Sequence, residues 1–222
     1  MPTTATAQNT GVVETAITFI QDGGFFMYPI LVVLALGLAL SLERIIYLQA
    51  TKAKNQKTWK DVYPLIAKGQ FRQALDVVSN SNTGMAKVIG YGLERAKTAK
   101  RHDDIELAME EGLMEIIPRL EARTPYIGTF ANIATLLGLL GTVTGMIATF
   151  QAITQYGTGD PKMMADGISQ ALVTTVLGLV AAIPLLFLHS LVAARSKALI
   201  QLLEQQSAGL IALHLGGERR SD

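Results

Sequence analysis

Six residues in the second half of the chain carry hydroxyl or amide side chains at helical spacing within long apolar segments: Thr135, Thr142, Thr149, Gln170, Thr174 and Thr175. The first three are seven residues apart, so they stack on one helix face with a shift of about 20° per step. Such side chains cannot hold a transported proton, but they can orient water and hydrogen-bond a carboxyl group. Because polar residues within a membrane face a bundle interior or a water-filled path, they predict a polar pathway between two helices.

Helix packing is the alternative interpretation of the same segments. Four glycines are interleaved with the threonines: Gly138, Gly141, Gly145 and Gly178. Small residues let helices approach closely, and the second and third of these glycines form a GxxxG pattern. A threonine can also bond the carbonyl group four residues before it without serving any pathway. Packing accounts for the glycines, while the threonines leave both interpretations open.

Three segments must position these side chains, and each is almost free of charge. They cover residues 23–42, 124–159 and 167–194, the last with only His189 as a possible charge. A helix needs about 20 mainly apolar residues to cross a hydrocarbon core of about 30 Å, and each segment is long enough. We therefore predict an all-α integral membrane protein with three transmembrane helices and a helical cytoplasmic extension.

The basic residues indicate how these helices are oriented. None of the 19 Lys and Arg precedes the first apolar segment; fourteen lie between Arg44 and Arg123, one is Lys162, and four follow Ala194. Lys and Arg accumulate on the cytoplasmic side of membrane proteins. The N-terminus is therefore expected outside the cytoplasm, and the middle region and the tail inside.

The predicted organisation follows from these two patterns. It comprises a periplasmic segment (1–24), transmembrane helix 1 (25–48), a cytoplasmic helical loop (49–123), transmembrane helix 2 (124–153), a periplasmic loop (154–166), transmembrane helix 3 (167–194) and a cytoplasmic tail (195–222). Within the first segment, residues 12–22 present one apolar face and predict a short helix on the outer membrane surface. The charged helical pattern that begins at Leu93 is expected to run into the second span.

Enzyme motifs are missing from the sequence. The segment GTGDPK lacks the spacing of a phosphate-binding loop, and the three histidines, His102, His189 and His214, are far apart. The chain has no cysteine, which excludes cysteine-ligated metals. We expect no enzymatic activity, no metal, no cofactor and no nucleic-acid partner.

Two motifs resemble those of a known family. They are GLLGTVTGMIATF, residues 138–150, and GISQALVTTVLGLVAAIPLLFLHS, residues 167–190. Together with the three-span topology and the charged middle loop, they resemble the MotA/TolQ/ExbB proton-channel family. Three spans rather than four place the chain nearer to its ExbB and TolQ branches than to MotA.

This resemblance implies a stator subunit in the bacterial inner membrane. Family members form a ring, commonly a pentamer, around the membrane helices of a single-span partner of the ExbD/TolR type. Protons that move down the gradient protonate an aspartate of that partner, and the work reaches a TonB- or TolA-like protein. By match to the family motif, Thr142 and Thr175 line the proton path. The ExbB branch would energise outer-membrane transport; a TolQ-like role in envelope integrity, a sodium-driven branch and a non-conducting membrane scaffold are the alternatives.

The sequence departs from the family pattern at two positions. ExbB and TolQ proteins usually carry a glutamate where this chain has Gln170, and ExbB has an asparagine in place of Ser190. Neither polar span contains Asp or Glu. The titrating carboxyl group must then come from the partner, whose aspartate would sit against Thr142 and Thr175.

Overall fold

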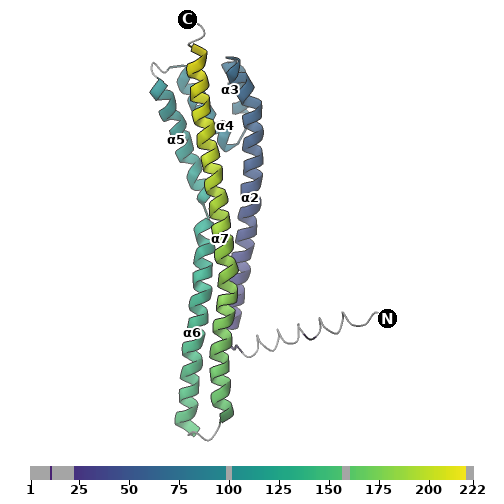
Figure 1. Cartoon of the computed structure of the whole chain (residues 1–222), viewed down its shortest axis with the longest axis vertical. Coiled ribbons are helices and arrows are strands. Elements are labelled where there is room, and N and C mark those ends of the chain that lie inside the picture. Colours follow the sequence, from purple (N-terminus) through teal and green to yellow (C-terminus); the bar gives the residue numbers. More distant parts are fainter. Residues whose placement is uncertain (1–10, 12–22, 99–101, 157–160, 219–222) are drawn as a thin grey trace, which may run out of the picture. The chain divides into compact units, whose positions relative to one another are not determined.

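The computed structural model describes residues 11, 23–98, 102–156 and 161–218 (Figure 1). Its elements are all helices: α2 (Met27–Ala67), α3 (Phe71–Ser79), α4 (Gly84–Ala96), α5 (His102–Glu121), α6 (Thr124–Tyr156) and α7 (Pro161–Glu218). Three helical stretches, in α2, α5–α6 and α7, are long and apolar enough to cross a membrane. The all-α fold with three spanning helices is thus confirmed. The surface helix predicted over residues 12–22 lies outside the described residues.

The chain divides into two compact units. Unit 1 comprises residues 1–41 and 125–189, and unit 2 comprises residues 42–124 and 190–222. Helices α2 and α7 contribute to both. Unit 1 contains all six of the hydroxyl and amide residues singled out above, whereas most of the charged residues are in unit 2.

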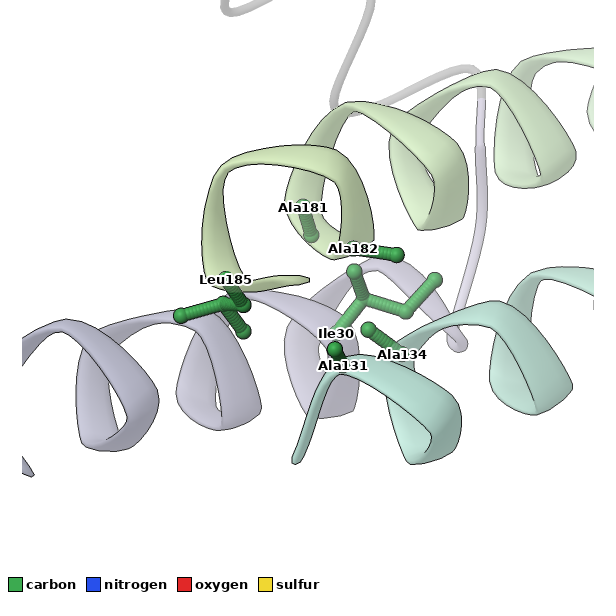
Figure 2. Close-up of a cluster of buried hydrophobic side chains, with 6 residues drawn as sticks. All are labelled: Ile30, Ala131, Ala134, Ala181, Ala182 and Leu185. Carbon is green, nitrogen blue, oxygen red and sulfur yellow. The ribbon is translucent and has the colours of Figure 1, made fainter. Parts of the chain in front are cut away.

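The core of unit 1 is built from small side chains. Figure 2 shows one cluster in which α2 supplies Ile30, α6 supplies two alanines, and α7 supplies two alanines and Leu185. Five of these six residues are completely buried or nearly so, and Ala182 is 2% exposed. Lipid is as apolar as such side chains, so close van der Waals contact, rather than hydrophobic burial, holds membrane helices together. Alanine permits that contact at the point where three helices meet.

Glycines bring α6 and α7 still closer. A Cβ atom built on Gly178 would lie 2.9 Å from both the carbonyl oxygen of Ala134 and the Cα atom of Gly138. Further along the pair, a Cβ atom on Gly145 would lie 2.8 Å from the Cβ atom of Ala171. These neighbours are backbone atoms or a short side chain, which cannot move aside separately. The two helices therefore share a tight seam that leaves no room for larger residues, and we call it the glycine seam (Gly138, Gly145, Ala171 and Gly178).

Unit 2 is an assembly of helices with an apolar interior. In α4, Met85, Val88, Ile89 and Gly92 are buried at helical spacing, which gives the helix one inward face. The helix begins where the hydroxyl of Thr83 accepts a hydrogen bond from the N–H of Ala86, the usual capping arrangement. Its buried face packs against neighbouring helices, α5 among them.

A break separates α5 from α6, contrary to the expected continuous pattern. Arg123 has a φ of 65°, which ends α5 in a left-handed residue. The carbonyl group of Leu120, left without a helical partner, accepts hydrogen bonds from the Arg44 guanidinium and, at 3.0 Å, from the Ser196 hydroxyl. Arg123 in turn pairs with Glu43 at 2.9 Å. The sequence pattern missed the break because these partners are distant in the chain.

An ion-pair cluster links α4 to α5 and should make stability depend on pH. A hydrogen bond from Lys87, at 2.8 Å, and its charge hold the pKa of the Glu115 carboxylate below its ordinary value of 4.5, with smaller contributions from Tyr91 and Arg119. A lowered pKa means that the stabilisation is complete above the ordinary value and is lost as the pH falls through the folded-state value. The unfolding midpoint of the wild type should therefore exceed that of Glu115→Gln at neutral pH, and the difference should vanish in acid. Thermal unfolding at a series of pH values measures it. Glu106→Gln, which removes an exposed carboxylate from the same helix, is the matched control, and equal midpoints for wild type and Glu115→Gln at neutral pH would contradict the assignment.

Candidate ion pathway

The three threonines of α6 differ in burial along the helix. Thr135 is exposed, Thr142 is half-buried, and Thr149 is only 3% exposed. The seven-residue repeat falls short of two full turns by about 20°, so each successive threonine lies closer to the face that packs on α7. The stripe therefore begins at an exposed position, Thr135, and ends at Thr149 inside the α6–α7 contact.

The hydroxyls of these threonines all donate to their own helix. The acceptors are Ala131 for Thr135 at 3.2 Å, Leu139 for Thr142 at 2.5 Å, and Gly145 for Thr149 at 3.0 Å. A hydroxyl oxygen that has donated its proton keeps acceptor capacity. Where the side chain is not fully buried, that oxygen can accept a hydrogen bond from water or from a protonated carboxyl group. Of the two threonines that are not fully buried, Thr142 is the one beside the glycine seam.

Thr175 of α7 lies against the same part of α6. Its hydroxyl is 3.3 Å from the carbonyl oxygen of Gly138 and 3.2 Å from that of Ala171, and it can donate to one of them at a time. Residues four apart lie one above the other on a helix face, so Gly138 is one turn below Thr142. Thr142 and Thr175 are both half-buried. Thr175 thus contacts α6 one helical turn from Thr142.

Gln170 and Thr174 of α7 both contact the segment before α2. The hydroxyl of Thr174 is completely buried, 3.0 Å from the carbonyl oxygen of Gly23 and 2.6 Å from that of Gln170. The Gln170 amide packs so closely on Gly24 that a Cβ atom there would come within 1.9 Å of its nitrogen. Five residues correspond to about 140° around a helix, which separates Gln170 from Thr175. Gln170 therefore contacts the segment before α2 and lies away from Thr175. Thr174 contacts that segment and also α6, because a Cβ atom on Gly141 would lie 2.3 Å from its Cγ2 atom.

The contact of Gly23 and Gly24 with α7 was not predicted from the sequence. Gly24 has a φ of 68°, in the left-handed region that glycine adopts without strain. A left-handed backbone without a side chain allows Gln170 to lie directly on it. The glycine pair was the available signal, but nothing local in the sequence points to a partner on α7.

Thr149 and His189 pack on glycines of the neighbouring helix. A Cβ atom on Gly167 would lie 2.3 Å from the Thr149 hydroxyl, so this threonine fills the end of the α6–α7 contact. The imidazole ring of His189 lies beside Gly128, where a Cβ atom would be 3.4 Å from its Nε2 atom. Among the described residues, no group of three or more His, Cys, Asp or Glu is placed to hold a metal ion. The chemistry of the site is thus that of hydroxyl and carbonyl groups.

Comparison with known proteins gives a consistent result. A putative biopolymer transport protein ExbB homolog of Methanothermobacter thermautotrophicus is 30% identical over 182 residues, which are 82% of this chain and 64% of that protein. The Tol-Pal system protein TolQ of Haemophilus influenzae is 35% identical over 94 residues, 42% of this chain and 41% of that protein. The biopolymer transport protein ExbB of Salmonella typhimurium is 32% identical over 129 residues, 58% of this chain and 46% of that protein. The chain thus spans less than two thirds of the length of each of these relatives.

The family assignment rests on a longer match. Residues 80–205, more than half of the chain, match the sequence model of the MotA/TolQ/ExbB proton channel family. This range includes α4, α5, α6 and most of α7, and with them both helices that carry the candidate pathway. The chain is a multi-pass membrane protein that belongs to the MotA/TolQ/ExbB proton channel family.

Proposed function

We propose that this chain is the ring-forming stator subunit of a proton-driven motor in the bacterial inner membrane, with its N-terminus in the periplasm. The observation that supports the proposal is the contact of the Thr175 hydroxyl with the Gly138 carbonyl group, one helical turn from Thr142, between two expected spans (residues 124–153 and 167–194) that contain no Asp or Glu. Hydroxyl and carbonyl oxygens can accept hydrogen bonds from water and from a protonated carboxyl group. In this proposal five such subunits form a ring. The ring lines the proton path with polar groups but contains no side chain that carries the proton.

The carrier in this proposal is an aspartate on an ExbD/TolR-type partner with one transmembrane helix. When the carboxyl group is neutral it can move past the threonine face, and when it is charged it must remain solvated. A proton that crosses the membrane releases about 2.3 kcal/mol per 100 mV of potential. The energy would pass through the partner to a TonB-like protein and drive outer-membrane transport.

A TolQ-like role in envelope integrity is the second candidate. The relative in Haemophilus influenzae is named for the Tol-Pal system, and its identity of 35% is at least as high as that of the ExbB relatives. Complementation of bacterial strains that lack either ExbB or TolQ separates the two. Rescue of the ExbB-deficient strain alone supports the first role, and rescue of the TolQ-deficient strain alone supports the second.

Proton flux in vesicles tests the proposal directly. The full chain is reconstituted with its single-span partner, a potassium gradient with valinomycin sets the potential, and a dye reports internal pH. We expect flux with the partner present, and no flux with this chain alone or with the partner's aspartate changed to asparagine. Proton flux through this chain alone would contradict the proposal that the partner supplies the proton carrier. Flux that depends on sodium and leaves pH unchanged would identify the ion as sodium.

A further inference from the structure

A pocket of about 200 Å³ in unit 2 lies among α2, the start of α4 and the end of α5. Three basic residues line it, Lys54, Lys87 and Arg119, and none of its lining residues is acidic. Glu115, just outside the lining, pairs with Lys87 at 2.8 Å and with Arg119 at 3.1 Å. One carboxylate thus faces three basic side chains, so the pocket keeps a net positive charge.

The N-terminus of α4 also faces this pocket. Gly84, its first residue, lines the pocket, and so does the capping residue Thr83. The aligned peptide groups of a helix place a partial positive charge at this end. The N–H groups of Met85 and Ala86 are already bonded to Asn55 and Thr83, so the helix contributes its partial positive charge, beside the basic side chains, to a space that suits an anion.

A buried amide supplies an independent observation. Asn55 lines the pocket and is 1% exposed; its Oδ1 atom accepts a hydrogen bond from the N–H of Met85 at 3.0 Å. That bond fixes the orientation of the amide, because the flipped amide would place its NH2 group against the N–H of Met85, donor against donor. The Nδ2 group is then a buried donor without a protein partner. Buried donors are almost always satisfied, so an unpaired one next to a pocket indicates a bound ion or water.

Arg44 adds a second buried donor beside the same pocket. It is 3% exposed, its guanidinium lies 4.8 Å from the ring centre of Tyr47, and it donates to the carbonyl group of Leu120. Tyr47 and Leu120 are both pocket residues, and the Nε group of Arg44 has no protein partner. Two unpaired donors are therefore associated with this basic pocket: Asn55 lines it, and Arg44 contacts two of its lining residues.

We propose that this pocket binds an oxyanion of the phosphate type. Phosphate has enough acceptor oxygens to meet the Asn55 amide and two or three basic side chains at once, and its charge suits the positive end of α4. It could come from a soluble phosphate compound or from the headgroup of an acidic phospholipid. Tyr47 is five residues beyond Leu42, about 8 Å along α2 from the end of the charge-free segment, which places one edge of the pocket within reach of headgroups. The pocket shares no residue with the proposed ion pathway.

Phosphate-dependent stability tests the soluble source. The full chain in detergent is unfolded by heat at constant ionic strength, with sodium phosphate replacing sodium chloride, and the emission of Trp59, one turn from Asn55, reports unfolding. A ligand that binds only the folded state raises the midpoint. We expect Lys54→Gln with Arg119→Gln to weaken binding by about tenfold or more. Lys57→Gln with Lys60→Gln removes the same charge from exposed positions of α2 and should leave binding unchanged.

Asn55→Asp separates ligand loss from misfolding. Aspartate keeps an oxygen for the Met85 N–H, so the start of α4 remains capped, but it replaces the unpaired donor with a negative charge. The variant should fold and its midpoint should not respond to phosphate. If phosphate raises the midpoint of Asn55→Asp as much as that of the wild type, the amide does not contact the ligand and the proposed site is wrong.

Retained lipid tests the headgroup source. The wild type is extracted from vesicles of phosphatidylcholine with and without phosphatidylglycerol, and native mass spectrometry detects bound lipid. Phosphatidylglycerol that is retained by the wild type and by the Lys57/Lys60 control, but lost from the Lys54/Arg119 variant, identifies the headgroup as the ligand. A phosphate response without retained lipid identifies a soluble ligand. If neither phosphate nor phosphatidylglycerol binds, water satisfies the buried donors and the proposal is overturned.

Discussion

Gly178→Ala is expected to destabilise the protein by about 1–3 kcal/mol or more, and Gly178→Val to prevent α6 and α7 from packing. The added Cβ atom would lie 2.9 Å from the carbonyl oxygen of Ala134 and from the Cα atom of Gly138, which are backbone atoms of the facing helix. Relief requires the helices to separate, and every contact of the glycine seam then weakens. Unfolding in mixed detergent micelles, followed by far-UV circular dichroism, measures the loss.

Gly209→Ala is the matched control for this substitution. Gly209 lies on the same helix, and a Cβ atom there would meet nothing within 4 Å. Alanine is the better helix former by about 1 kcal/mol, so this variant should be at least as stable as the wild type. Equal stabilities for Gly178→Ala and Gly209→Ala would show that the α6–α7 seam is looser than the structure has it.

The seam also sets the geometry of the candidate pathway. Thr175 reaches the carbonyl group of Gly138 only because no side chain stands between the helices at Gly138 and Gly178. Packing and a polar pathway were alternatives when judged from the sequence. In the structure the glycines supply the contact, and two threonines lie at its edge. The two interpretations describe neighbouring faces of the same helix pair.

The spanning helices could be predicted from sequence because their signal is local. A charge-free segment of sufficient length needs no knowledge of its neighbours, and the structure has three helices long and apolar enough to cross a membrane. Burial within a span could not be predicted in the same way. The equal spacing of the three α6 threonines suggested one shared environment, whereas the drift of a 3.6-residue helix gives each a different one.

The other features that could not be predicted from the sequence are contacts between residues far apart in the chain. Gln170 was grouped with the pathway threonines, yet its amide lies on Gly24, a contact set by how the segment before α2 meets α7. The hydrogen bond from Arg44 to Leu120 joins residues 76 apart. Neither spacing nor composition carries information about such contacts, because they depend on the packing of several helices at once.

The combined substitution of Thr142 and Thr175 by valine is expected to lower proton flux with the partner by about tenfold or more. Valine keeps the shape of threonine and removes the hydroxyl, and a hydrogen bond to a charged group contributes about 1.5–3 kcal/mol. The folded structure loses the hydrogen bond that Thr175 donates to a carbonyl oxygen, and Thr142 loses one within its own helix. Those bonds contribute about 0.5–1.5 kcal/mol each, so the variant should still fold and form its ring.

Two further variants assign the loss of flux to the hydroxyl groups of this pair. Thr129→Val with Thr154→Val removes two hydroxyls that also donate within α6, at 3.2 and 2.8 Å, from exposed positions, and should leave flux unchanged. Serine at positions 142 and 175 retains the hydroxyls and should restore most of the flux that valine removes. Vesicle flux, with ring formation checked by light scattering, measures all three variants. If the valine variant conducts at the wild-type rate, protons do not pass along the face that Thr142 and Thr175 share, and the pathway must lie on another surface of the ring.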